Sequence, residues 1–324
     1  MKYTALGASG IQVSRICLGG LSFGQITPGG HQWLLDQAQC TDMIRHALDL
    51  GVNFIDTANK YADGTSEEYI GQALKRLGVP RHEVVLATKV YFNSTTTEHL
   101  TKQAILAEID LSLRRLQTDY VDLYQIHRYD YDTPVEETME ALDSLVRAGK
   151  VRAIGASSMY GYQFHNMQLA AEKNDWTRFS TMQNHYNLIY REDERELIPI
   201  CRQYGVALIP YSPLASGHLS HRAWDSGTAR SRTDAMAAKK YDRSMDADLK
   251  VIERVEEVAL QRGVTMSQIA LAWLFHKGAA APIVGATKMA HFDDATAAVD
   301  LTLTDAEAAY LEELYQPHAV MGAL

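Results

Sequence analysis

Cysteine is scarce in this sequence, which excludes a fold held together by disulfides and a zinc site made of cysteines. The 324 residues contain only Cys17, Cys40 and Cys201, an odd number with no C-x-x-C pair. A disulfide framework or a cysteine zinc cluster needs more cysteines at closer spacing. The cysteine content fits a reducing compartment instead, and we expect a cytoplasmic protein.

Long apolar runs and an excess of basic charge are also missing. The most apolar long stretch, IALAWLFHKGAAAPIVGA, is interrupted by His276, Lys277, Gly278 and Pro282, so we do not expect it to span a bilayer. The first twenty residues lack the apolar core of a secretory signal. The formal net charge is −9 at pH 7, which gives no general attraction to nucleic acid or to an anionic membrane. We therefore expect a soluble globular protein, in which an anionic ligand would need a local basic pocket.

Short β-branched runs alternate with helical patterns along the whole sequence. Strands are predicted at residues 15–20, 52–58, 83–89, 120–127, 151–157, 180–186, 206–212 and 282–286. Helices are predicted near residues 39–50, 66–77, 101–116, 134–148, 162–173, 193–204, 246–261, 266–276 and 291–299, with a long loop after residue 212. Eight such units, spaced by about 40 residues and with apolar strands, predict one closed α/β barrel of the (β/α)8 TIM type. We expect it to form a single domain over residues 1–324, with an N-terminal hairpin at 3–13 and an extra C-terminal helix at 305–315.

A doubly wound open sheet is the competing architecture. That fold binds dinucleotides at a G-x-G-x-x-G turn after its first strand. The corresponding segment here, CLGGLSFG, does not match the pattern. A dinucleotide cofactor would therefore be bound in another way.

Polar residues at the predicted strand ends suggest acid–base chemistry. Barrels of this type carry their active sites at the carboxyl ends of the strands. Asp56 and Tyr61 follow the second predicted strand, Lys89 ends the third and His127 ends the fourth. A lysine that closes the apolar run VVLAT needs a partner for its charge, and Asp56 can supply it. The ammonium would lower the pKa of the Tyr61 phenol from about 10, which favours a general acid.

Six motifs, in chain order, resemble the aldo-keto reductases. They are N-F-I-D-T-A-x-x-Y (53–61), L-A-T-K (86–89), D-L-Y-Q-I-H (122–127), G-A-S-S (155–158), I-P-Y-S-P-L-A-S-G (209–217) and I-V-G-A-T-K (283–288). The bacterial branch related to voltage-gated potassium channel β subunits is the most similar, judged by Y-S-P-L-A-S-G. The resemblance implies reduction of aldehydes or ketones to alcohols, or the reverse, with NADP(H). Tyr61 would be the general acid, tuned by Lys89 and Asp56, and His127 would orient the carbonyl.

The same resemblance implies a set of cofactor contacts. The nicotinamide would contact Ser157, Gln183 and Tyr211. The pyrophosphate would lie along the loop that contains Ser212, Leu214 and Gly217. The adenosine 2′-phosphate would meet Gly285, Thr287 and Lys288. Arg230 or Arg232 matches an arginine that the family folds over the cofactor, and His291 stands at an adenine-side position. Ser158 and Ala295 depart from the usual residues, and Ala295 cannot hydrogen-bond adenine. A solvated loop position is the alternative for Lys288.

Several interpretations remain open at this level. The substrate pocket would be formed by a mainly aromatic set: Trp33, Tyr91, Phe92, Arg128, Tyr129, Tyr131, Tyr160 and Tyr186. Arg128 could hold a substrate anion, although pairing with Asp130 or Asp132 is slightly favoured. A metal site at His218-x-x-His221 lacks an acidic third ligand, so solvated histidines are expected. A glycosidase would need two facing carboxylates at the strand ends, where His127 and Tyr211 stand.

The functional alternative is a regulatory NADP(H)-binding subunit that turns over slowly. Such a subunit needs a partner surface, and we see no low-complexity arm to supply one, which favours the enzyme. We expect a small carbonyl or alcohol substrate and no nucleic-acid or membrane partner. A homo-oligomer is left open.

Overall fold

Eight parallel strands form one sheet in the computed structural model, which describes residues 1–27, 30–94, 96–224, 227 and 233–321. Their spatial order is β10-β3-β4-β5-β6-β7-β8-β9, and each neighbouring pair is parallel. Backbone hydrogen bonds from Ala280 N–H to the Leu208 carbonyl (2.8 Å) and from Ile283 N–H to the Pro210 carbonyl (2.9 Å) bring the two ends of this order together. The predicted (β/α)8 barrel is therefore confirmed.

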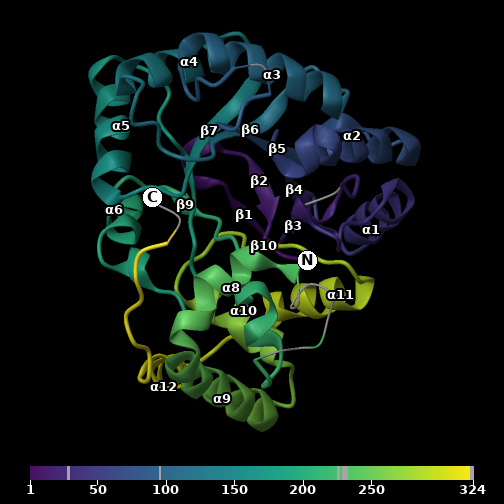
Figure 1. Cartoon of the computed structure of the whole chain (residues 1–324), viewed down its shortest axis with the longest axis vertical. Coiled ribbons are helices and arrows are strands. Elements are labelled where there is room, and N and C mark those ends of the chain that lie inside the picture. Colours follow the sequence, from purple (N-terminus) through teal and green to yellow (C-terminus); the bar gives the residue numbers. More distant parts are fainter. Residues whose placement is uncertain (28–29, 95, 225–226, 228–232, 322–324) are drawn as a thin grey trace.

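The strands are short and the helices surround them (Figure 1). The strands are β3 (Cys17–Gly19), β4 (Phe54–Asp56), β5 (Val85–Val90), β6 (Val121–Ile126), β7 (Val151–Ser157), β8 (Thr181–Gln183), β9 (Ala207–Leu208) and β10 (Ile283–Val284). The helices are α1 (Gln37–Asp49), α2 (Thr65–Leu77), α3 (Lys102–Leu116), α4 (Val135–Arg147), α5 (Gly161–Lys173), α6 (Leu197–Gln203), α8 (Ala235–Tyr241), α9 (Met245–Arg262), α10 (Met266–His276), α11 (Met289–Ala297) and α12 (Asp305–Glu312). In the described part of the chain, no helix combines the length and the apolar character that crossing a membrane requires.

The predicted hairpin closes the amino-terminal end of the barrel. Its strands β1 (Tyr3–Ala5) and β2 (Gln12–Ser14) pair antiparallel, and Leu6 and Val13 are buried with the interior residues Phe54 and Leu123. Gly7 at the turn has φ +56°, and a Cβ there would lie 2.2 Å from the Ser180 carbonyl oxygen, so only glycine fits. With this end filled by side chains, the opposite, carboxyl end of the strands is left for a site.

Two elements differ from the sequence-based prediction. The helix expected over 193–204 begins only at Leu197, because Pro199 has no N–H and must lie in the first turn. Within the loop expected after residue 212, helix α8 forms, and the Asp234 side chain accepts a hydrogen bond from Ala237 N–H at its start. The capped run A-M-A-A-K-K has high helix propensity, so the sequence did contain this signal.

Candidate active site

Lys89 is the centre of a buried polar cluster at the carboxyl end of β5. Its side chain is 0% exposed, and Nζ donates hydrogen bonds to Asp56 Oδ2 (2.6 Å), the Thr57 carbonyl (2.8 Å) and Tyr61 Oη (3.3 Å). Burial alone would lower the pKa of Lys89, but the Asp56 carboxylate and then the Tyr61 hydroxyl raise it above its ordinary value. Lys89 is therefore an ammonium whose three N–H groups are all used.

Asp56 ends β4 and is held from a second side. Its Oδ1 accepts hydrogen bonds from Gln125 Nε2 and Gln183 Nε2, both at 2.9 Å. Gln125 was missed in the sequence, although it lies two positions before His127 in an apolar strand and so faces the same way. Gln183, expected to bind the nicotinamide carboxamide, also donates to Gln125 Oε1 (3.3 Å). Both carboxylate oxygens of Asp56 are thus satisfied within the barrel.

Tyr61 opens a tight turn between β4 and α2. The next three residues, Ala62, Asp63 and Gly64, have φ of 47°, 51° and 92°, all in the left-handed region. Burial raises the pKa of Tyr61, and the Lys89 ammonium only partly opposes this rise. The expectation that Lys89 would lower this pKa below its ordinary value is therefore wrong, since desolvation of the phenolate outweighs the ammonium. Tyr61 consequently keeps its proton at neutral pH.

His127 follows β6 and lies beside Tyr61. The two rings meet edge to face at 5.8 Å between centroids, and the Phe92 ring is edge-on to the imidazole at 5.4 Å. Burial, followed by the charges of Lys89 and Arg128, holds the pKa of His127 well below its usual value. Its Nδ1 is buried and has no hydrogen-bond partner among the residues that the structure describes. A neutral imidazole of this kind can hydrogen-bond an uncharged oxygen.

A second buried network behind the cluster was not anticipated. Glu67 accepts hydrogen bonds from Thr88 Oγ1 and Arg115 Nε, each at 2.5 Å. Glu108 Oε2 accepts one from Asn59 Nδ2 (3.1 Å), two residues before Tyr61, and lies 3.8 Å from Arg115 Nη2. Both glutamates are 0% exposed. Because the partners are distant in sequence, no local pattern predicts them, yet they tie α2 and α3 to the strand end and to the turn that carry Lys89 and Tyr61.

On the other side of the barrel mouth stands the Tyr211 ring. Residues 185 and 211 form an isolated parallel bridge, and the Tyr211 ring stacks on His185 at 5.2 Å and 8°. Lys240 Nζ of α8 lies 4.7 Å from the Tyr211 ring centroid. Ser157, at the end of β7, has its Oγ 3.2 Å from Ser158 Oγ. Of the residues expected around a nicotinamide, Ser157 thus ends β7, Gln183 ends β8 and Tyr211 follows β9.

The segment after Tyr211 makes an unusual turn. Ser212 has φ 51°, and the Asn187 side chain donates to its carbonyl (2.9 Å). After Leu214, the residues Ala215, Ser216 and Gly217 have φ of 48°, 58° and 112°. The Ala215 and Gly217 N–H groups donate to the Ser212 (2.9 Å) and Leu214 (2.8 Å) carbonyls, so they are used within the turn itself. Arg230 and Arg232, also expected near the cofactor, lie outside the described residues.

The predicted phosphate-binding residues gather after β10. Gly285, Thr287 and Lys288 are exposed just before α11, and His291 is exposed in its first turn. Within the described chain, the Lys288 side chain forms no hydrogen bond or ion pair. Ala295 is fully buried, so it faces the core rather than a ligand. An exposed lysine at a helix N-terminus is suited to an anion.

The aromatic residues expected around the substrate do not all lie together. Tyr91 stacks on His99 (4.1 Å between centroids, 3°), while Phe92 is 38% exposed beside His127. Tyr129 and Tyr131 meet edge to face at 5.0 Å. Trp33 is largely buried against His31. Tyr160 is half-buried at the start of α5, where its ring stacks on that of Tyr162 (6.1 Å).

Two expectations about this pocket are wrong. Tyr186 is buried in the core against Trp273, with 5.1 Å between ring centroids, because its hydroxyl donates to Glu194. Arg128 forms no ion pair with any residue in the described ranges, so the slightly favoured pairing with Asp130 or Asp132 does not occur. Its Nη1 donates only to the His127 carbonyl (2.9 Å).

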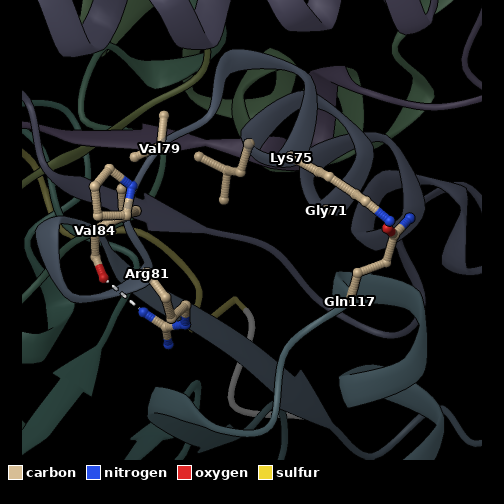
Figure 2. A pocket seen from close by; sticks show the side chains of 8 residues that line it. Gly71, Lys75, Val79, Arg81, Val84 and Gln117 are labelled. Atoms are coloured by element: carbon tan, nitrogen blue, oxygen red, sulfur yellow. Dashed lines mark hydrogen bonds between the residues drawn. The ribbon is translucent and has the colours of Figure 1, made fainter.

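A surface pocket elsewhere is unrelated to these residues. It lies at the amino end of β5, the opposite end from Lys89, and Figure 2 shows Lys75, Arg81, Val84 and Gln117 around it. The Arg81 guanidinium there is already used, because it donates to the Val84 carbonyl (2.7 Å) and to Asp122 Oδ2 (2.7 Å).

Of the two histidines considered as metal ligands, His218 packs against an aromatic side chain. His218 stacks on Trp224, with 4.0 Å between the ring centroids. Over the described residues, no group of three or more His, Cys, Asp or Glu side chains could hold a metal ion.

Comparison with known proteins agrees with the motifs. The model of the aldo/keto reductase family matches residues 15–316. Versiconal hemiacetal acetate reductase of Aspergillus parasiticus is 42% identical over 342 residues, which span 99% of this chain and 98% of the relative. Aldo-keto reductase dtxS3 of Metarhizium robertsii is 42% identical over 348 residues (99% and 93%), and a putative aryl-alcohol dehydrogenase of Schizosaccharomyces pombe is 40% identical over 352 residues (99% and 98%). The chain therefore belongs to the aldo/keto reductase family.

Proposed function

We propose that this protein is an NADP(H)-dependent oxidoreductase that interconverts carbonyl compounds and alcohols, with Tyr61 as the general acid and base. The observation that carries the proposal is the buried ammonium of Lys89, bound at once to the Asp56 carboxylate and to the Tyr61 hydroxyl. This arrangement places a protonated phenol next to a fixed positive charge. The family and the named relatives support an oxidoreductase, and the finer roles are our proposal.

The residues of the mouth fit a nicotinamide cofactor. Tyr211 would supply a ring for stacking, and Ser212, Leu214 and Gly217 would lie along the pyrophosphate. The Gly217 N–H donates to the Leu214 carbonyl (2.8 Å), so it is not one of the groups left for the phosphates. Gln183 would use its side-chain oxygen, because its amide nitrogen already donates to Asp56 and Gln125. The remaining contacts would be made by Ser157, Arg230, Gly285, Thr287, Lys288 and His291. When bound, the cofactor would supply the hydride that reaches the carbonyl carbon.

The chain's own residues would manage the proton. His127, neutral at pH 7, would hydrogen-bond the carbonyl oxygen and orient it towards Tyr61. Tyr61 Oη would donate its proton as negative charge develops on that oxygen. The phenolate left behind would be stabilised by Lys89 Nζ, which already contacts Tyr61 Oη at 3.3 Å. Asp56, held by Gln125 and Gln183, keeps Lys89 in place, so that little reorganisation is needed during the reaction.

A panel of aldehydes, ketones and alcohols, assayed by absorbance with NADPH, NADP, NADH and NAD in parallel, tests this proposal. We expect carbonyl reduction with NADPH at ordinary enzyme rates. Tight NADPH binding with very slow turnover of every compound would favour a regulatory redox-sensing subunit instead. Absence of both binding and turnover would reject the proposal.

We also propose the domain organisation, the location and the family branch that the sequence suggested. These are a single domain over residues 1–324, a cytoplasmic location and membership of the bacterial branch related to voltage-gated potassium channel β subunits. Gel filtration coupled to light scattering would show whether the protein is a homo-oligomer.

A further inference from the structure

Arg128 is a charged group in the barrel mouth that the proton-transfer scheme does not use. It directly follows His127, and its Nη1 donates to the His127 carbonyl at 2.9 Å. Among the residues that the structure describes, no carboxylate pairs with it. A half-buried guanidinium with five N–H donors and one protein acceptor has donors left for a ligand.

The carboxylates nearest in sequence are committed elsewhere or face solvent. Asp130 accepts hydrogen bonds from Leu100 N–H (3.0 Å) and Thr133 Oγ1 (2.6 Å), and Oδ1 takes one from Asp132 N–H (3.0 Å). These bonds fold the loop after β6 around Asp130 and hold its carboxylate away from Arg128. The Asp132 side chain is exposed. The loop is therefore built so that its arginine remains unpaired.

The charge of Arg128 reaches residues on several sides of the mouth. It opposes the burial that raises the pKa of Tyr61, of Tyr91 and of Tyr211, and it adds to the lowering of the pKa of His127. The hydrogen bond from Nη1 to the His127 carbonyl (2.9 Å) fixes the guanidinium at the carboxyl end of β6, beside His127. Lys89 is neutralised by Asp56 and His127 is uncharged, whereas Arg128 has no ion-pair partner in the part of the chain that the structure describes.

We infer that this site prefers carbonyl substrates that carry an oxyanion of their own, a carboxylate or a phosphate, and that Arg128 binds it. A planar guanidinium matches both groups with two parallel hydrogen bonds. The chain has a net charge of −9, so such a substrate needs a local cation for binding. The inference rests on the proposed carbonyl reductase function and adds its substrate class.

The test compares matched substrates in the full-length protein with NADPH. The carboxylate arm uses 4-carboxybenzaldehyde against its methyl ester, and the phosphate arm uses glyceraldehyde 3-phosphate against glyceraldehyde. In the wild type we expect the anion to have the higher kcat/KM in at least one arm, and added salt to raise the KM of that anion. The arm with the larger ratio identifies the oxyanion.

Two variants and a control assign the preference to Arg128. Arg128→Gln should lower the anion-to-neutral ratio of kcat/KM by about 10- to 100-fold, as expected for loss of a charge-assisted contact. Arg128→Lys should keep part of the anion-to-neutral ratio, because lysine keeps the positive charge but lacks the paired N–H donors of the guanidinium. Arg114→Gln, which removes an exposed arginine near the end of α3, should leave the ratio unchanged.

The outcomes separate this inference from the proposed function. If the wild type reduces the neutral aldehydes but shows no preference for an anion, the substrate class is wrong and the reductase proposal stands. If Arg128→Gln lowers both members of a pair equally, or weakens NADPH binding instead, Arg128 does not select the substrate. If no carbonyl compound is reduced with any nicotinamide cofactor, the proposed function itself fails.

Discussion

The two halves of the barrel mouth differ in how their polar groups are satisfied. On the β4–β6 side, Lys89 uses all three of its N–H groups on protein acceptors, and Asp56 accepts bonds at both oxygens. After β10, Thr287 and Lys288 are exposed beside the start of α11, and within the described residues the Lys288 side chain forms no hydrogen bond or ion pair. We infer that the proton-transfer half is set by the fold alone, whereas the cofactor half is completed by its ligand.

The largest expected effect comes from removing the buried charge of the first half. Lys89→Met leaves the Asp56 carboxylate buried without its partner, which should lower the free energy of unfolding by about 3–5 kcal/mol. It should also slow turnover about as much as loss of the Tyr61 proton donor. Denaturant unfolding and steady-state assays measure the two effects.

The exposed pair of Lys60 and Asp63 (2.8 Å) provides the control for this variant. Their side chains are 56% and 73% exposed. Lys60→Met should cost no more than about 1 kcal/mol. Equal losses for Lys60→Met and Lys89→Met would show that burial of the Lys89–Asp56 pair has no energetic consequence.

A smaller effect is expected in the cofactor half. Lys288→Ala should weaken NADPH binding by about 1.5–3 kcal/mol, because a charge-assisted contact to the 2′-phosphate is lost. NADH, which lacks that phosphate, should bind nearly as before, and the unfolding free energy should not change. Fluorescence titration with both cofactors measures this, with the exposed Lys173→Ala as control. Equal losses for NADPH and NADH would mean that Lys288 is placed wrongly.

The smallest effect is a pH dependence of stability from His127. Its pKa is lower in the folded protein than in the unfolded chain, so below about pH 6.5 the unfolded state binds a proton that the folded state does not. His127 should therefore contribute stability above pH 6.5 that is lost as the pH falls. Relative to His127→Gln, the wild type should lose up to about 1.4 kcal/mol per pH unit below pH 6.5. A constant difference between the two proteins from pH 7.5 to 5 would contradict an imidazole that stays neutral in the folded protein.

Local patterns predicted the barrel and the strand-end residues, because both depend on short runs of sequence. Apolar runs and turn residues indicate each strand and helix, and the parallel topology then brings Asp56, Lys89 and His127 to one end. That Arg128 does not pair with Asp130 could not be predicted in this way. It depends on Leu100 and Thr133 competing for Asp130, and Leu100 lies 30 residues away.

Contacts between residues far apart in the sequence also explain why the buried glutamates and the direction of the Tyr61 pKa shift were not predicted. The buried Glu67–Arg115 pair joins residues 48 positions apart, so neither side chain looks unusual within its own helix. The direction of the Tyr61 pKa shift depends on how completely the fold removes water, which composition does not reveal. Helix α8 is different, because its Asp234 cap and alanine-rich run are visible in the sequence.

The central claim is that Tyr61 supplies the proton, and single-turnover hydride transfer in Tyr61→Phe tests it most directly. The substitution keeps the ring and removes the hydroxyl, so NADPH should bind with nearly its original affinity. Followed by the loss of NADPH absorbance, the transfer to a good aldehyde should slow by about 10²–10⁴-fold, the usual contribution of a general acid. An undiminished single-turnover rate would show that the proton comes from His127 or water, and that the role given to Tyr61 is wrong.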